Sequence, residues 1–284
     1  SEVRNRTISS RALPIESPTI LLIRSATAPA DSPDPNNSTS LAIVSFVNFS
    51  VVAPRVCFAS LDAFTLLDAN TALRDLATEL AQSYPRLSTM RYESGDARKL
   101  LAAAPEADLV VASYVINELS ENERAALADA MWAKTRDTLL VVEPGTPAGY
   151  ARIIDLRARL IAKGAHAIAP CPHDAECPLT KPDWCHFTQR LQRSRAHKHL
   201  KAADLPYEDE KFSYVVLSRA APAQRPKRVL AQPLVTKIAV TAKICAADGI
   251  EAASVPHRDR ASYKRAKKWN WGDAVFRDRV TTPE

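Results

Sequence analysis

The feature that most constrains this chain is a stretch rich in cysteine and proline at residues 169–195. It holds three of the five cysteines, Cys171, Cys177 and Cys185, which are separated by five and then seven residues. A proline directly follows each of the first two. Because proline fixes φ and removes a backbone donor, this segment can be neither a helix nor a central strand. We therefore expect a rigid loop that points its thiols inward, with Cys245 as the candidate fourth ligand.

Thiolates on a stiff loop are typical of an iron–sulfur cluster or of structural zinc. The spacing matches neither the paired C-x2-C motifs of a zinc ribbon nor the compact run of a bacterial ferredoxin. His173 and His186 lie beside the cysteines, so a mixed Cys/His zinc site stays open. A third alternative is buried thiols without metal, because free cysteine is among the most buried residue types.

The composition bounds the class of protein. A chain of 284 residues forms one large domain or two smaller ones. No apolar run approaches the ~20 residues of a membrane span, so we expect no membrane association. The N-terminus lacks the layout of a secretory signal, and the cysteine count is odd. We therefore expect an intracellular monomer without a disulfide framework.

The positive charge is concentrated in the C-terminal third. Residues 185–280 carry 20 Lys and Arg against 9 Asp and Glu, a local net charge of +11 within a chain of net charge +6. A basic end on an acidic body predicts a polyanionic partner. Nucleic acid is favoured over a merely solvated basic surface.

The first 60 residues are atypical. Residues 27–39 (TAPADSPDPNNST) have the composition of a disordered linker, and 41–52 form an apolar run that fits a strand. No glycine occurs before Gly95, which is unusual for an α/β chain. We expect a partly disordered segment over 1–60.

Strand and helix patterns alternate over residues 61–219. Strands are predicted at 64–67, 90–93, 107–114, 137–142, 165–169 and 212–218. Helices are predicted at 71–84, 120–134, 149–163 and 186–200. Ser120 and Glu123 form a capping box for the second helix. This rhythm predicts an α/β fold with a parallel, doubly wound sheet.

Four polar residues follow predicted strand ends: Asp68, Asp96, Asn117 and Glu143. The carboxyl edge of such a sheet is where ligands bind, so together they predict a nucleoside pocket. Taken singly, each has a plain alternative: Asp68 as a helix N-cap and Asp96 as a turn residue.

Residues 220–284 have a different character. Runs at 237–244 and 250–255 flank the sequence AADG, which is a hairpin turn signal. We expect a small, basic β appendage, with Cys245 at the hairpin tip and able to fold back on the cysteine loop.

Two basic elements in this third are predicted to bind RNA. On the helix predicted at 186–200, Arg190, Arg193, His197 and Lys201 share one face. The second element is 258–271, whose aromatic residues can stack on unpaired bases. Its cations are Arg260, Lys264, Arg265, Lys267 and Lys268, and its aromatic residues are Tyr263, Trp269 and Trp271.

Several stretches resemble the methyltransferase-like assembly factors of the mitochondrial small ribosomal subunit and their bacterial relatives. They are TLLDAN (65–70), DLVVASYVINEL (108–119), LLVVEPGTPAGY (139–150), APCPHDAECPL (169–179), DWCHF (183–187) and LPYEDEKFSYVVLSR (205–219). The resemblance implies a Rossmann-like class I methyltransferase domain related to S-adenosylmethionine enzymes and a role on small-subunit rRNA. It also implies a 4Fe–4S cluster on Cys171, Cys177, Cys185 and Cys245, without Cys57. The implied location is the mitochondrial matrix or a bacterial cytoplasm.

The sequence departs from that family at the cofactor loop. Class I methyltransferases open with a strand and a Gly-rich loop, because only glycine lets the backbone approach the cofactor closely. No glycine precedes Phe64, so we expect S-adenosylmethionine to bind weakly or not at all, with Asp68, Asp96 and Asn117 as the remaining contacts.

We identify no catalytic residue. Residues 114–118 read YVINE in place of an N-P-P-Y tetrad, and no cysteine nucleophile lies there. The sequence favours an rRNA-binding assembly factor of the small ribosomal subunit that carries a 4Fe–4S cluster. The alternatives are an active rRNA methyltransferase and, less favoured, a metal-dependent redox enzyme.

Overall fold

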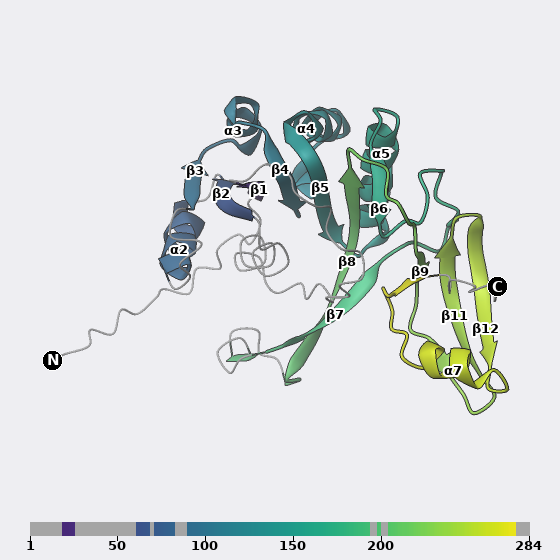
Figure 1. Ribbon diagram of the computed structural model, residues 1–284. Coiled ribbons are helices and arrows are strands. Elements are labelled where there is room, and N and C mark those ends of the chain that lie inside the picture. Colours follow the sequence, from purple (N-terminus) through teal and green to yellow (C-terminus); the bar gives the residue numbers. More distant parts are fainter. Residues whose placement is uncertain are drawn as a thin grey trace.

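Two β-sheets organise the part of the chain that the computed structural model describes, which is residues 19–25, 61–68, 71–82, 90–193, 198–199 and 204–276 (Figure 1). The linker expected at 27–39 and the strand expected at 41–52 lie outside these residues. The α/β class predicted from the sequence is confirmed.

The larger sheet has eight strands in the order β3-β2-β1-β4-β5-β8-β6, and β7 pairs with β8 outside this path. The strands are β1 (Thr19–Ser25), β2 (Leu61–Asp68), β3 (Arg91–Ser94), β4 (Ala107–Ser113), β5 (Thr135–Pro144), β6 (His166–Ala169), β7 (Phe187–Gln192) and β8 (Tyr207–Ser218). Every strand predicted from residue 64 to 218 is present, with shifted ends.

The prediction of a parallel sheet holds for only part of it. β2 pairs with β3 and β4 with β5 in parallel, but β1 runs antiparallel to both β2 and β4. β8 is antiparallel to β5 and β6. β8 also forms an antiparallel ribbon with β7, and an antiparallel pair needs no crossover helix. The larger sheet is therefore mixed.

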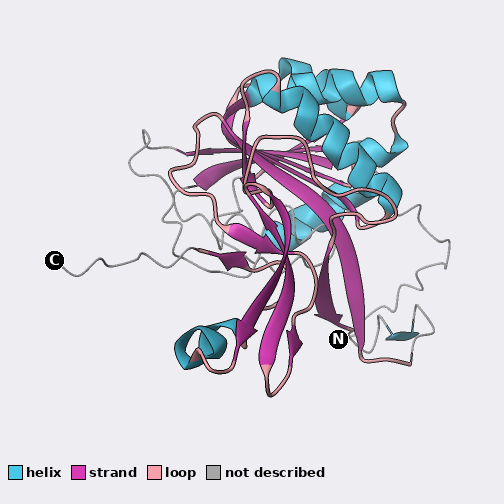
Figure 2. Cartoon of the chain, turned by 90° about the vertical axis from the view of Figure 1, so that its right-hand side faces the viewer, coloured by secondary structure: helices cyan, strands magenta, loops and turns pink. Residues whose placement is uncertain are grey.

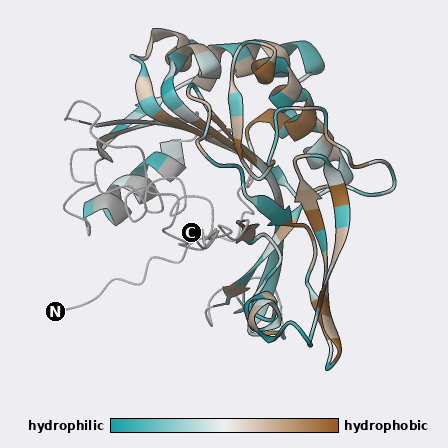
Figure 3. Ribbon diagram, turned by 45° about the vertical axis from the view of Figure 1, so that its right-hand side comes forward, coloured by the Kyte–Doolittle hydropathy of each residue, from teal (hydrophilic) through white to brown (hydrophobic). Residues whose placement is uncertain are grey.

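Three helices cover one face of this sheet: α3 (Ala97–Ala103), α4 (Glu121–Lys134) and α5 (Pro147–Ile161), as Figures 1 and 2 show. α2 (Thr71–Gln82) follows β2, and the 3-10 turn η2 (Ile116–Glu118) follows β4. The main core lies between the three helices and the sheet, where hydrophobic residues gather (Figure 3). Among the helices that the structure describes, none has the length and apolarity that crossing a membrane requires.

Local signals fix the helix ends. Glu123 Oε2 accepts hydrogen bonds from the Ser120 amide at 3.0 Å and from the Ser120 hydroxyl at 2.7 Å, so the predicted capping box is present. Thr146 Oγ1 accepts from the Gly149 amide at the start of α5. α5 gives way to Gly164 at φ 85°, a backbone conformation that favours glycine.

The smaller sheet has five strands in the order β10-β11-β9-β13, with β12 on β11. They are β9 (Lys227–Val229), β10 (Leu234–Val235), β11 (Ala239–Ala246), β12 (Gly249–Pro256) and β13 (Ala274–Val275). β11 and β12 form the hairpin predicted around the AADG turn. α7 (Arg260–Ala266) packs Tyr263 and Ala266 against Val240 of β11.

The helix predicted at 186–200 is wrong over residues 186–193, whereas the described residues 198–199 are helical. Residues 187–192 form β7, in register with β8 from the Phe187–Phe212 pair to the Gln192–Tyr207 pair. Phe187 packs its ring against Phe212 and Tyr214, with ring centroids 6.0 and 5.2 Å apart. This cross-strand packing outweighs the helical spacing of the cations.

Candidate metal centre

The four candidate ligands, Cys171, Cys177, Cys185 and Cys245, line one cavity with about 490 Å³ of empty space, part of it open to solvent. Cys171 follows β6, Cys177 lies in the loop, and Cys185 precedes β7. Cys245 comes from β11 of the smaller sheet, one pair before the end of the hairpin. The cavity therefore receives thiols from both sheets.

Asp174 holds the first half of the cysteine loop in place through contacts with β6 and Arg225. Its carboxylate accepts from the Ala167 amide at 2.7 Å and contacts His166 Nδ1 at 3.1 Å, both on β6. Arg225 donates to the same carboxylate at 2.5 Å from the segment that leads to the smaller sheet. Burial is the largest single influence and acts to raise the pKa of Asp174, but these contacts together outweigh it and lower the pKa to about 2.

The second half of the loop is anchored by backbone acceptors. Trp184 Nε1 donates to the carbonyl of Gly145 at 3.0 Å, just before α5. Ser213 of β8 donates its hydroxyl to the carbonyl of Cys185 at 2.9 Å. These two hydrogen bonds fix the position of the backbone around Cys185 and do not involve its thiol.

Polar groups contact the thiols directly. The Tyr150 hydroxyl on α5 lies 3.2 Å from Cys177 Sγ. His173 Nε2 lies 3.9 Å from Cys245 Sγ, so the histidine considered for a zinc site does reach the cavity. Arg157, also on α5, lines the same cavity, and its charge acts to lower the pKa of Cys171.

The thiols influence one another's protonation. Burial is the largest cause that raises the pKa of Cys171, Cys185 and Cys245, in the last case to about 12. The charges of neighbouring cysteines raise all three further, while Arg228 opposes the rise. The raised pKa values favour the neutral form of these three thiols, and binding a metal requires their deprotonation.

The donor set has the size that a metal centre needs. Four thiols supply the ligand number of a 4Fe–4S cluster and also that of a structural zinc ion. Among the described residues, no group of three or more His, Cys, Asp and Glu side chains is placed so that it could hold a metal ion as the side chains lie.

Sequence comparison places the chain in a family. Residues 24–276 match the family described as mitochondrial small ribosomal subunit Rsm22. This chain belongs to the Rsm22 family.

Curated relatives of this Rsm22-family chain are mitochondrial proteins. The human mitochondrial ribosome assembly protein METTL17 is 29% identical over 234 residues, which cover 76% of this chain and 50% of that protein. The Schizosaccharomyces pombe Rsm22-cox11 tandem protein 2 is 26% identical over 219 residues, covering 58% of this chain and 28% of that protein. The chain thus spans half or less of the curated relatives that it matches.

A solved structure with a partial likeness is the magnesium protoporphyrin IX methyltransferase of Synechocystis PCC 6803 with bound SAH. The likeness covers 54% of this chain and 62% of that chain, with 11% sequence identity and a TM-score of 0.33.

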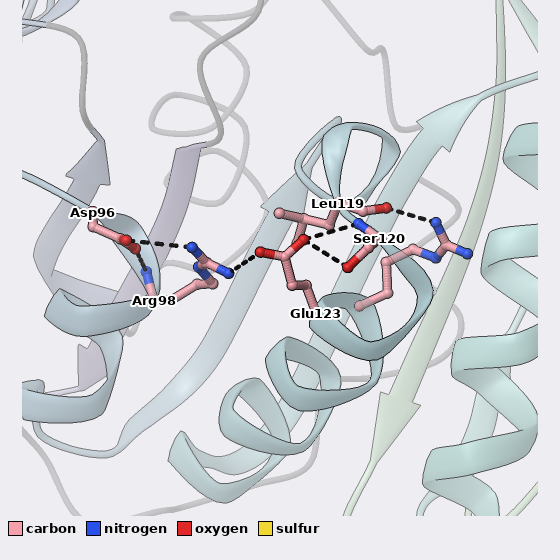
Figure 4. Close-up of polar contacts among 6 residues, drawn as sticks. Asp96, Arg98, Leu119, Ser120 and Glu123 are labelled. Atoms are coloured by element: carbon pink, nitrogen blue, oxygen red, sulfur yellow. Dashed lines mark hydrogen bonds and ion pairs between the residues drawn. The ribbon is translucent and has the colours of Figure 1, made fainter.

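The carboxyl-edge residues have local roles in the Rsm22-family chain. Asp96 caps α3 by accepting from the Arg98 amide at 2.9 Å, and this hydrogen bond is the largest cause that lowers the pKa of Asp96. The Arg98 guanidinium then reaches Glu123 at 2.6 Å (Figure 4). Asp68 is buried at the end of β2, and its carbonyl accepts from the Gly95 amide. The cavity lined by cysteines includes neither aspartate.

The other two edge residues face the interior. Glu143 is fully buried and pairs with Arg152 at 2.9 Å, while Ile116 donates its amide to the same carboxylate at 3.3 Å. Burial raises the pKa of Glu143 despite this ion pair. Asn117 Oδ1 is buried without a hydrogen-bond partner. Cofactor binding by Asp68, Asp96 and Asn117 stays a prediction.

In a class I methyltransferase the Gly-rich loop follows the first strand, but here β1 runs in the opposite direction to β2 and β4. Thr19 pairs with Ser113 and Ile20 with Leu67, so the start of β1 lies at the carboxyl ends of β2 and β4. The end of β1, at Ser25, therefore lies at the opposite edge. β1 itself contains no glycine.

The predicted RNA-contacting residues separate into two groups. Arg190 pairs with Asp209 at 2.7 Å and Arg193 with Glu208 at 3.1 Å across the β7–β8 ribbon, so the predicted helical face does not exist. His197 and Lys201 lie outside the described residues. Around α7, in contrast, the cations are exposed: Arg258, Arg260, Lys264, Arg265, Lys267 and Lys268.

The aromatic residues around α7 pack inward, contrary to the prediction that they stack on bases. Tyr263 is 9% exposed and donates its hydroxyl to the Thr236 carbonyl. Trp271 packs against the cluster of Val142, Phe187 and Phe212, and its Nε1 is buried. Trp269 packs against the core under α7. Tyr263 and Trp269 therefore belong to the core of the smaller sheet, whereas Trp271 packs against the larger sheet.

Sequence reasoning missed the arginines and the tyrosine at the cavity. Arg157 falls on the apolar face of α5, four residues after Ile153 and three before Leu160. A charged residue at a core position is the signal that could have found it. Tyr150 lines the cavity and Arg228 lies beside it only through tertiary structure, so their local sequence carries no comparable signal.

Proposed function

We propose that this chain acts in assembly of the small ribosomal subunit by binding its rRNA, and that Cys171, Cys177, Cys185 and Cys245 hold a 4Fe–4S cluster. The observation that carries the proposal is the convergence of these thiols on one cavity, three from the loop between β6 and β7 and one from the smaller sheet. Membership of a family described by the mitochondrial small ribosomal subunit supports the ribosomal part.

The surroundings of the cavity support a cluster. The Tyr150 hydroxyl next to Cys177 supplies the hydrogen bond that commonly accompanies a metal-bound thiolate. Ile153, Leu179 and Leu230 line the cavity and keep water away from its thiols. Zinc remains the competing metal, because His173 also reaches Cys245.

A bound cluster would tie the smaller sheet to the larger one. Cys245 belongs to β11, and the other three ligands belong to the loop between β6 and β7. Arg228 of β9 already bridges the same sheets by donating to the Pro170 carbonyl at 3.2 Å. Metal binding would add to this contact, because the free energy of binding at such a site stabilises the fold.

The exposed cations around α7 form the proposed RNA surface. They lie on the same small sheet that Cys245 joins to the cavity. Lysine and arginine bind RNA phosphates, and this contact is independent of the aromatic stacking that the structure excludes for Tyr263. The geometry of α7 relative to the larger sheet would then depend on the cluster.

We further propose that the chain transfers no methyl group. The central strand β1 runs against its neighbours and presents no glycine to a cofactor at the carboxyl edge. The strand order still resembles that of a class I methyltransferase, which agrees with an inherited fold without the activity. Isothermal calorimetry with S-adenosylmethionine should detect no binding in the low-micromolar range, and binding there would overturn this part of the proposal.

The setting follows from the relatives. The curated relatives named above are mitochondrial, and we place this chain in the mitochondrial matrix or, in a bacterial host, in the cytoplasm. We propose that it acts as a monomer on the small subunit.

The proposed function can be tested by measuring affinity for small-subunit rRNA with cluster-loaded and cluster-free protein over a salt series. The loaded protein should bind more tightly, and its affinity should fall steeply with salt through counterion release. A transfer RNA of similar charge density serves as the control for unspecific binding. Equal affinities for both RNAs, or for loaded and cluster-free protein, would contradict the proposal.

A further inference from the structure

Arg157 is a buried cation at the wall of the cysteine cavity. It is 2% exposed, and its Nη2 donates to the carbonyl of His173 at 2.6 Å. Its Nε is buried without a hydrogen-bond partner. Within the described part of the chain, no carboxylate forms an ion pair with it. Because a guanidinium stays charged in proteins, its burial calls for a nearby anion.

Arg228, on the other sheet, lies beside the same cavity and contacts Pro170, one of the residues that line it. It lies opposite Cys245 in the register of β9 and β11. Its Nε and Nη1 donate to the carbonyls of Pro170, at 3.2 Å, and Gly272, at 2.9 Å. In the ranges that the structure describes, it too has no carboxylate partner.

The charges of the two arginines match those of a loaded site. Four thiolates around an oxidised 4Fe–4S core of charge +2 leave a net charge of −2. Two guanidinium groups carry the opposite charge. Without an anion in the cavity, the described residues offer Arg157 and Arg228 no counter-charge, which is unfavourable in a medium of low dielectric constant.

We propose that Arg157 and Arg228 are the counter-ions of the cluster and that their charge sets how readily it accepts an electron. This inference rests on the proposed function, because it takes the cluster as the anion. One-electron reduction makes the site more negative, so nearby cations favour the reduced form and raise the reduction potential. Arg157 has the larger effect, because it is the more deeply buried and water screens its charge less.

The test compares reduction potentials of anaerobically purified variants. Dithionite supplies the electron, and visible absorbance or electron paramagnetic resonance gives the midpoint. Arg157→Gln should shift the midpoint to more negative values, and Arg228→Gln should shift it less. Arg157→Lys keeps the charge and should stay close to the wild-type value. The matched control is Arg159→Gln on the same helix, since Arg159 is exposed and pairs with Asp129.

Each outcome has one meaning. The inference is overturned if both Arg157→Gln and Arg228→Gln have the wild-type midpoint potential. It is also overturned if Arg157→Gln and Arg157→Lys shift the midpoint by the same amount. If Arg157→Gln does not fold, Arg228→Gln decides the matter in the same way. A wild-type protein without iron overturns the proposed cluster and this inference together, whereas a loaded wild type with unresponsive midpoints overturns the inference alone.

Discussion

At the scale of single residues, Asp174 holds the cysteine loop against β6 and against the segment that leads to the smaller sheet. Its pKa is lowered to about 2 in the folded protein, compared with about 3.9 in an unfolded chain. A lowered folded-state pKa adds stability above the unfolded value, and this stability is lost as the pH falls through the folded value. The carboxylate therefore stabilises the protein at neutral pH and ceases to do so between about pH 4 and pH 2.

We predict that Asp174→Asn removes this part of the acid sensitivity. At neutral pH the variant should lose about 1–2 kcal/mol of unfolding free energy, after a discount for the partial exposure of the side chain. Below about pH 2 it should match the wild type. Urea unfolding across the pH range measures the difference, with Asp248→Asn at the exposed hairpin turn as the control. A constant difference between variant and wild type at all pH values would contradict the assignment.

At the scale of elements, α5 carries two groups, Tyr150 and Arg157, to the cavity, and its start is tightly packed. A Cβ at Gly149 would lie 2.0 Å from the carbonyl oxygen of Pro144. We predict that Gly149→Ala displaces the start of α5 and costs about 1–3 kcal/mol. Thermal unfolding measures the loss. The neighbouring Ala148 is exposed, and Ala148→Ser should change stability by no more than about 0.5 kcal/mol. Similar values for the two variants would show that α5 shifts without strain.

The β11–β12 hairpin is expected to depend on Cys245 for its stability. We predict that Cys245→Ser loses iron and destabilises the smaller sheet, because the cluster would then lack its only ligand from that sheet among the described residues. Iron content and hydrogen exchange of residues 239–256 are the two measurements. Cys57→Ser is the control, since Cys57 is predicted to take no part. Full iron retention in Cys245→Ser would remove Cys245 from the ligand set.

At the scale of the whole molecule, the exposed cations around α7 are predicted to carry the rRNA affinity. Reversing Lys264, Arg265, Lys267 and Lys268 to Glu should weaken binding and lower the salt slope by about 0.7–0.9 for each phosphate that the variant no longer neutralises. The matched control reverses four exposed cations of the larger sheet and its helices, Arg74, Arg91, Lys99 and Arg136. An unchanged affinity and slope in the first variant, or an equal weakening in both, would place the RNA elsewhere.

Structural features that depend on interactions between neighbouring residues are predictable from the sequence. The capping box at Ser120 and Glu123 and the AADG turn depend on neighbours within a few residues, and both predictions are confirmed. The cations around 187–192 have the spacing of a helix, but the segment is a strand, because its conformation is set by pairing with β8, which is distant in the sequence.

The site is only partly predictable for the same reason. The proline-stiffened loop and one distant thiol are enough to predict that four cysteines share a site, and the four do line one cavity. Tyr150 lines it, and Arg228 lies beside it, through tertiary contacts alone. The sequence predicts the rings of Tyr263 and Trp271 at the surface, but Tyr263 packs against Val240 and Trp271 against Val142, Phe187 and Phe212, which are distant in the sequence.

The most direct test of the account is the metal content of anaerobically purified protein, measured together with its visible spectrum. We predict about four iron atoms and about four sulfides per chain, with the broad absorption near 400 nm that is typical of a 4Fe–4S cluster. Stoichiometric zinc with neither iron nor sulfide would contradict the central claim.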